Sequence, residues 1–144
     1  MNLIITKSTE KEVEAFEAQS WSAEDLKHYR REVSWDEWNP TKFIFKAELD
    51  NEIAGIIGGN ITVGVTFIER IIVSESFRKM GIGKQLIQKV EDYAKELNSH
   101  KIYLYTGKDW SSNKFYEQIG FKNTGELENH YLNVDFVIYT KFLK

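Results

Sequence analysis

The sequence predicts a single α/β domain of the α+β kind, with elements in the order β-α-α-β-β-β-α-β-α-β-β. Three observations support this prediction. Short apolar or alternating stretches bounded by turns predict strands. Apolar side chains at helical spacing between residues 82 and 98 predict an amphipathic helix. A chain of 144 residues is long enough to bury the core of one domain.

The first forty residues predict a short strand and two helices. Leu3–Ile5 is apolar and predicts the strand. Ser8 and the acidic residues that follow it predict the start of a helix ending near Gln19. A second helix is expected from Ser22, and the only proline, Pro40, ends this region.

Three strands are predicted in the middle of the chain. Residues 43–49 alternate between apolar and polar side chains, and a tight turn at residues 50–52 leads back into Ile53–Ile61. Gly58-Gly59-Asn60 predicts a bulge or bend in this second strand. Val65–Val73 is mostly apolar and predicts the central strand.

The last third of the chain predicts two helices and three strands. The amphipathic helix spans Ile82–Asn98, and a strand follows at Lys101–Thr106. Trp110–Ile119 predicts a short helix that a glycine ends. Phe121–Leu127 and Tyr131–Phe142 predict the last two strands.

Composition excludes several classes of function. The chain has no cysteine, which excludes disulfides, thiolate metal sites and a cysteine nucleophile. Its three histidines lack metal-ligand spacing, so we expect no metal. The net charge of −3 does not suit nucleic-acid binding, which needs a basic face. Apolar stretches are too short for a membrane helix, and the first residues lack signal-peptide features. We therefore expect a cytoplasmic protein.

The most informative segment runs from Val73 to Leu86 and joins a strand to a helix through two glycines. Unpaired backbone N–H groups of the first helical turn and the helix dipole favour an anion there. Glycine lets the backbone approach a phosphate because no Cβ intervenes. Arg78, Lys79 and Lys84 add positive charge. The alternative is a plain surface turn with solvated lysines.

Two familiar phosphate loops do not fit this segment. The dinucleotide fingerprint G-x-G-x-x-G needs a third glycine, and Leu86 stands at that position. The nucleoside-triphosphate loop needs Ser or Thr after its lysine, whereas Lys84 is followed by Gln85.

Arg78-Lys-Met-Gly81-Ile-Gly83 resembles instead the acyl-CoA pyrophosphate loop of the GNAT (Gcn5-related N-acetyltransferase) superfamily, with the pattern Q/R-x-x-G-x-G/A. A second segment, Asn113-Lys-Phe115-Tyr116-Glu-Gln-Ile119-Gly120-Phe121, resembles the later family block A-x-x-F/L-Y-E-K-x-G-F. The two segments stand in the family's order, about 35 residues apart, and the detailed resemblance covers positions 65–127.

The resemblance implies a GNAT fold, with a central mixed and mostly antiparallel sheet of about seven strands and helices on both faces. It implies an acyltransferase that moves an acetyl group from acetyl-CoA to a primary amine in a direct, ternary-complex reaction. The acceptor could be a small amine, a polyamine, an aminoglycoside or a peptide amino group. A monomer or a homodimer is expected. The alternative is a non-catalytic acyl-CoA-binding sensor or interaction module.

The resemblance also assigns the residues that would bind the cofactor. Backbone groups at the end of the central strand would bind the pantetheine arm like an added strand. Amides of the glycine turn would bind the pyrophosphate, although the Arg78 side chain could instead pack the loop. The expected cofactor-binding residues are Ile71, Ile72, Val73, Arg78, Lys79, Met80, Gly81, Ile82, Gly83, Lys84, Asn113 and Tyr116.

Tyr116 and Glu69 are the candidate catalytic residues. The resemblance places Tyr116 near the cofactor sulfur, where its phenol could protonate the departing thiolate; the alternative is a packing role. Glu69 is a carboxylate inside an apolar strand and could be the general base that deprotonates the amine. It should share a strand face with Phe67 and Ile71 unless a bulge intervenes. An ion pair or a solvent-facing position is the alternative.

Two further groups could contact the acceptor. Histidine is the usual general base in proteins, so His130 is a second candidate base, unless a water chain serves instead. Four aromatic residues near the N-terminus either form core or shape a pocket for an amine through cation–π contacts. They are Trp21, Tyr29, Trp35 and Trp38.

Overall fold

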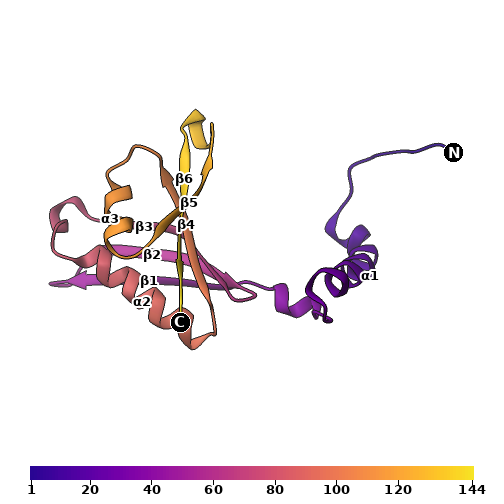
Figure 1. Ribbon diagram of the computed structural model, residues 1–144, viewed down its shortest axis with the longest axis horizontal. Helices are drawn as coiled ribbons and strands as arrows, with labels where there is room; N and C mark the ends of the chain where they lie inside the picture. The colour runs from indigo at the N-terminus through magenta and orange to yellow at the C-terminus, as the bar shows by residue number, and fades with distance from the viewer. The chain divides into compact units, whose positions relative to one another are not determined.

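The computed structural model describes residues 1–144, and the chain forms two compact units, residues 1–39 and residues 40–144. Figure 1 shows the elements of both units. No helix in either unit combines the length and the apolar character needed to span a membrane. The organisation of residues 1–144 as a single domain stays a prediction.

The first unit is built on one long helix, α1 (Glu10–Tyr29), and a 3₁₀ turn, η1 (Trp35–Trp38). The side chain of Thr9 accepts a hydrogen bond from the N–H of Glu12 at 3.2 Å. It thereby satisfies one of the N–H groups that the start of a helix leaves without a partner.

Two sequence predictions for this unit are wrong. Leu3–Ile5 forms no strand, and its side chains are exposed. A short apolar stretch needs a neighbouring strand to be stable, and none pairs with it. The two predicted helices are one, because residues 19–23 contain neither Gly nor Pro. The indole Nε1 of Trp21 donates to Oε2 of Glu17 at 3.0 Å across the predicted gap, a contact typical of a continuous helix.

The second unit contains a six-stranded sheet with the order β1-β2-β3-β4-β6-β5. Neighbouring strands are antiparallel except β3 and β4, which are parallel. The predicted fold class is therefore confirmed, with six strands in place of seven. The strands are β1 (Thr41–Leu49), β2 (Glu52–Thr62), β3 (Val65–Val73), β4 (Lys101–Gly107), β5 (Lys122–Leu127) and β6 (Phe136–Phe142).

Two helices of this unit, α2 (Ile82–Glu96) and α3 (Ser112–Gln118), share one hydrophobic core with the sheet. The apolar stripe predicted for α2 is buried in this core, and each large side chain contributes about 1.5–3 kcal/mol. Central members of the core are Ile57, Ile68, Leu86, Val90, Ile102, Leu104, Tyr116 and Val137.

A bulge interrupts the pairing of β2 with β3 opposite the glycines of β2, although its extra residue lies on β3 and not on the predicted strand β2. The register shifts between Gly58 and Gly59, and Glu69 on β3 is left without a partner. A Cβ on Gly59 would lie 1.9 Å from the carbonyl oxygen of Phe67, so only glycine fits there. A bulge of this kind bends the strand and increases its twist.

Beyond the bulge, β3 and β4 separate. They pair only where Val65–Phe67 runs beside Lys101–Tyr103. The last part of β3 pairs with β2 alone, so the edge that faces β4 is free near Ile71–Val73. Figure 1 shows β4, β5 and β6 crossing the direction of β1, β2 and β3. The sheet is thus open at the point where β3 leads into α2.

Candidate functional site

The turn between β3 and α2 presents a row of free backbone donors. Six consecutive N–H groups, from Lys79 to Lys84, have no hydrogen-bond partner within the chain. Gly81 caps α2 in a left-handed conformation with φ of 79°, which glycine adopts without strain. Because α2 begins at Ile82, the positive end of its dipole adds to these donors. The turn is therefore built to hold an anion.

Arg78 stiffens this turn from within. Its Nε donates to the carbonyl oxygen of Val73 at 3.2 Å, and its backbone N–H donates to the carbonyl oxygen of Glu75 at 3.4 Å. The guanidinium therefore ties the end of β3 to the start of the turn. Arg78 packs the loop in this structure, which was one of the two roles left open by the sequence.

A cavity of about 710 Å³ joins this turn to α3 and the free edge of β3. Five of the residues that line this cavity were not predicted from the sequence. Their positions along the chain do not show toward which side their side chains point. The unpredicted lining residues are Phe77, Ser111, Ser112, Phe115 and Gln118. The predicted residues that line it are Ile71, Ile72, Val73, Arg78, Lys79, Gly81, Ile82, Gly83, Lys84 and Tyr116.

Tyr116, the candidate catalytic side chain, lines this cavity. The residue is 6% exposed, and its hydroxyl makes no hydrogen bond within the chain. Burial raises the pKa of Tyr116 to about 12, because a buried phenolate loses its solvation. Tyr116 is thus a neutral phenol with a free hydroxyl, and it faces the same space as the anion-binding turn.

Two predicted cofactor residues lie outside the lining of this cavity. Met80 is 53% exposed on the turn. Asn113 donates from Nδ2 to the carbonyl oxygens of Gly107 at 2.8 Å and Trp110 at 2.7 Å, and its Oδ1 accepts from the Tyr139 hydroxyl at 2.9 Å. Its side chain therefore supports the loop before α3, while cofactor binding by Asn113 stays a prediction.

Tyr139 and Glu117 are supporting residues that the sequence did not reveal. The Tyr139 hydroxyl also lies 2.8 Å from Oε1 of Glu117, on the helix that carries Tyr116. Tyr139 follows three apolar residues of β6. From the sequence, its hydroxyl therefore cannot be told apart from that of a tyrosine that only packs in the core.

Glu69 lies apart from the main cavity. Glu69 is the extra residue of the bulge, so it need not lie on the same strand face as Phe67 and Ile71. The sequence predicted a shared face only in the absence of a bulge. Its Oε1 accepts from Asn60 Nδ2 at 3.0 Å, and Arg70 lies 3.9 Å from its Oε2. It lines a separate cavity of about 360 Å³. The role of Glu69 as a base stays a prediction.

His130 lies in the connection between β5 and β6, among aromatic rings. Its ring centroid is 5.6 Å from that of Tyr105 and 5.3 Å from that of Phe136. Its Nε2 is buried and has no hydrogen-bond partner. Tyr105 belongs to the part of β4 that has separated from β3, so His130 stands beside the opening of the sheet.

Comparison with curated proteins identifies relatives of this chain. N-acetylaspartate synthetase of Xenopus tropicalis is 32% identical over 94 residues, which are 63% of this chain and 35% of that protein. The chain spans about a third of the length of the curated relatives it matches.

Solved structures share the fold. An acetyltransferase from Bacillus cereus ATCC 14579 has a TM-score of 0.71 and 21% identity, and the match covers 98% of each chain. A GNAT family acetyltransferase from Elizabethkingia anophelis, solved with acetyl-CoA bound, has a TM-score of 0.65 and 26% identity. That match covers 69% of this chain and 75% of the other.

The model of the acetyltransferase (GNAT) family matches residues 10–121. The match confirms the family inferred from the two motifs. The chain belongs to the GNAT acetyltransferase family.

Proposed function

We propose that this protein is an N-acetyltransferase that moves an acetyl group from acetyl-CoA directly to a primary amine. One observation carries the proposal: five of the six residues with a free N–H at the start of α2 line the same cavity as Tyr116, whose hydroxyl is free. This arrangement suits a ligand with an anionic group at one end and a reactive group at the other.

The donor is expected to bind along the end of β3. Its pyrophosphate would accept hydrogen bonds from the N–H groups of Lys79 to Lys84, with charge supplied by the two lysines. Alternate backbone groups of Ile71–Val73 point to the free edge, where the amide-bearing arm of the donor can pair as an added strand does.

Tyr116 is proposed to assist the departure of the thiol. In the reaction the amine nitrogen bonds to the acetyl carbon, the carbon–sulfur bond breaks, and the sulfur gains a proton while the nitrogen loses one. Because the pKa of Tyr116 is raised to about 12, its phenol is neutral when the carbon–sulfur bond breaks and can give its proton to the departing thiolate. The phenolate then regains a proton from solvent, while the proton lost by the nitrogen goes to the base. Direct transfer needs no covalent intermediate on the protein, and the chain has no cysteine that could form one.

The base that deprotonates the amine is one of two side chains or a water chain. Neither side chain lines the main cavity, and His130 is favoured because its Nε2 lacks a hydrogen-bond partner. Glu69 is the other candidate, with its carboxylate already bonded to Asn60. The name of the relative N-acetylaspartate synthetase supports an amino group as the acceptor.

A thiol-release assay with acetyl-CoA and a panel of primary amines tests the proposal. We expect turnover on at least one amine and competition by CoA. Cofactor binding with no turnover on any amine would instead support the acyl-CoA sensor. Size-exclusion chromatography and cell fractionation test the expected monomer or homodimer and the cytoplasmic location.

A further inference from the structure

A second cavity, of about 270 Å³, lies within residues 1–39 and has walls of aromatic rings around one carboxylate. Three of its residues stand at positions i, i+4 and i+8 of α1, on one helix face, and two are the first and last residues of η1. We call this group the aromatic cage; its members are Trp21, Asp25, Tyr29, Trp35 and Trp38.

Asp25 is a buried carboxylate without a cationic partner. It is 8% exposed, its Oδ2 accepts from the indole Nε1 of Trp38 at 3.2 Å, and its Oδ1, which is open to solvent, has no hydrogen-bond partner within the chain. No Lys, Arg or His forms an ion pair with it. Aspartate is rarely buried this far unless a cation or a set of hydrogen bonds compensates its charge.

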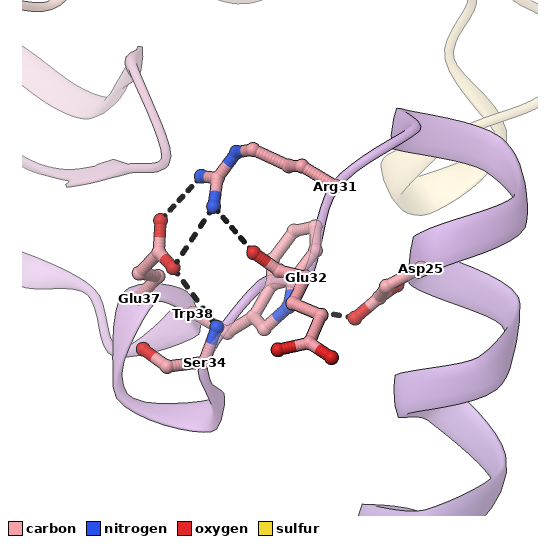
Figure 2. A network of polar contacts seen from close by, with 6 residues as sticks. All are labelled: Asp25, Arg31, Glu32, Ser34, Glu37 and Trp38. Carbon is pink, nitrogen blue, oxygen red and sulfur yellow. Dashed lines mark hydrogen bonds and ion pairs between the residues drawn. The ribbon is translucent and has the colours of Figure 1, made fainter.

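The nearest arginine in this network is already engaged. Figure 2 shows Arg31 directed at Glu37 and at the carbonyl oxygen of Glu32, while Asp25 contacts only Trp38. The hydrogen bond from Arg31 lowers the pKa of Glu37 to about 2, so this pair stays ionised over the usual pH range. Within residues 1–39, Asp25 is therefore left without a basic partner.

The surrounding charge also favours a cation. A neighbouring cavity of about 360 Å³ shares Asp25 and Trp35 with the aromatic cage and adds Glu32 and Glu37. Residues 1–39 carry nine Asp and Glu side chains against five Lys and Arg. The negative potential of such a region raises the local concentration of cations.

We propose that the aromatic cage binds an alkylammonium group, with the cation against the ring faces and its charge balanced by Asp25. Indole and phenol rings attract cations through their negative faces, and such cages recognise ammonium ligands in other proteins. One carboxylate with no further oxygen ligand in the cage does not suit Ca²⁺ or Mg²⁺, which need several. The ligand is therefore an organic cation.

Titration of the full-length chain with choline, without acetyl-CoA, tests this proposal. The neutral compound 3,3-dimethyl-1-butanol has the same shape and serves as the control ligand. We expect choline to shift the NMR signals of the indole N–H groups of Trp21, Trp35 and Trp38, while Trp110, which lies in the other unit, does not respond. We expect the neutral compound to bind at least tenfold more weakly.

Two matched variants localise the effect. Asp25→Asn keeps an acceptor for the Trp38 indole but removes the charge, and it should weaken choline binding at least tenfold. Glu24→Gln removes a charge from the same helix at an exposed carboxylate paired with His28, and it should change binding less than twofold. Circular dichroism checks that both variants fold.

Three results would overturn the proposal: no binding of choline, equal binding of the neutral compound, or equal weakening by Glu24→Gln and Asp25→Asn. The last two would indicate a nonspecific apolar surface or a general acidic field. Because acetyl-CoA is absent from the titration, its outcome is separate from that of the transferase assay.

Discussion

The hydroxyl of Tyr139 on β6 lies 2.8 Å from Oε1 of Glu117 on α3. The same hydroxyl contacts Asn113, one turn earlier on α3, at 2.9 Å. Tyr116 lies between these two positions, and its ring centroid is 5.8 Å from that of Tyr139. A single side chain of the sheet therefore anchors the helix that carries the candidate acid.

Replacing Tyr139 with phenylalanine should destabilise the protein by about 1–3 kcal/mol, because Asn113 and Glu117 lose a buried donor. Urea unfolding at pH 8 measures the change. The control is Thr124→Val, which removes a hydroxyl contact of 2.8 Å with Thr140 at the β5 edge and should cost less. Equal costs would contradict an anchoring role.

The pH dependence of the same variant follows from the pKa of Tyr139, which burial and then the contact with Glu117 raise to about 12. An unfolded tyrosine titrates near 10, so the folded state holds this proton more tightly. Its contribution to stability is complete below about pH 10 and is lost as the pH rises toward 12. The difference in the free energy of unfolding between the wild type and Tyr139→Phe should therefore become smaller between about pH 10 and pH 12.

Tyr116→Phe should lower kcat about a hundredfold or more and leave KM for acetyl-CoA within about threefold, since only the hydroxyl that acts on the leaving sulfur is lost. The raised pKa also predicts no loss of activity from ionisation of Tyr116 below about pH 11. Steady-state kinetics across pH measure both. Tyr93→Phe, in the core beside Phe43 and Phe45, is the control and should retain kcat.

The two candidate bases can be separated by substitution. We expect His130→Gln to lower kcat/KM about a hundredfold, because its Nε2 has no other hydrogen-bond partner. Glu69→Gln should leave kcat/KM within about threefold, because its carboxylate is already held by Asn60. Steady-state kinetics measure both. The opposite pattern would assign the base to Glu69, and an unchanged kcat/KM in both variants would point to water.

Gly81→Ala should raise KM for acetyl-CoA about tenfold. The space around Gly81 is open, so the cost comes from its φ of 79°, which disfavours a Cβ by about 1–2 kcal/mol. Gly81→Asn should do less harm, since asparagine tolerates this conformation better. Equal effects of the two variants would mean that the side chain, and not the backbone, disturbs the turn.

Lys141 and Glu91 form a partly buried ion pair at 2.6 Å, in which only the Glu91 carboxylate is buried, and Lys141 also donates to the carbonyl oxygen of Ile119 at 2.9 Å. Lys141→Met should cost about 3 kcal/mol, because it leaves the carboxylate of Glu91 buried without a partner. The double variant Glu91→Leu/Lys141→Met should be more stable than the single one. Urea unfolding that ranks the two in the opposite order would contradict this account.

Much of the second unit was predictable because its signals are local. The alternation of residues 43–49 and the apolar run of Val65–Val73 predicted β1 and β3, and helical spacing predicted α2. The prediction of a strand at Leu3–Ile5 was wrong because a strand needs a partner strand, which this segment does not contain. The predicted helix break near residue 20 was wrong because serine is compatible both with a helix cap and with a helix interior.

The features of the candidate site also fall into those that the sequence indicated and those that only the structure revealed. The sequence by itself indicated the family and a turn suited to an anion, because free N–H groups, glycines and a helix start come from adjacent residues. Only the tertiary structure decided that Tyr139 anchors α3, that the bulge sets Glu69 apart, and that α1 and η1 enclose Asp25 with aromatic rings. Those relationships join residues from different elements, and their geometry depends on register and packing that no single segment encodes.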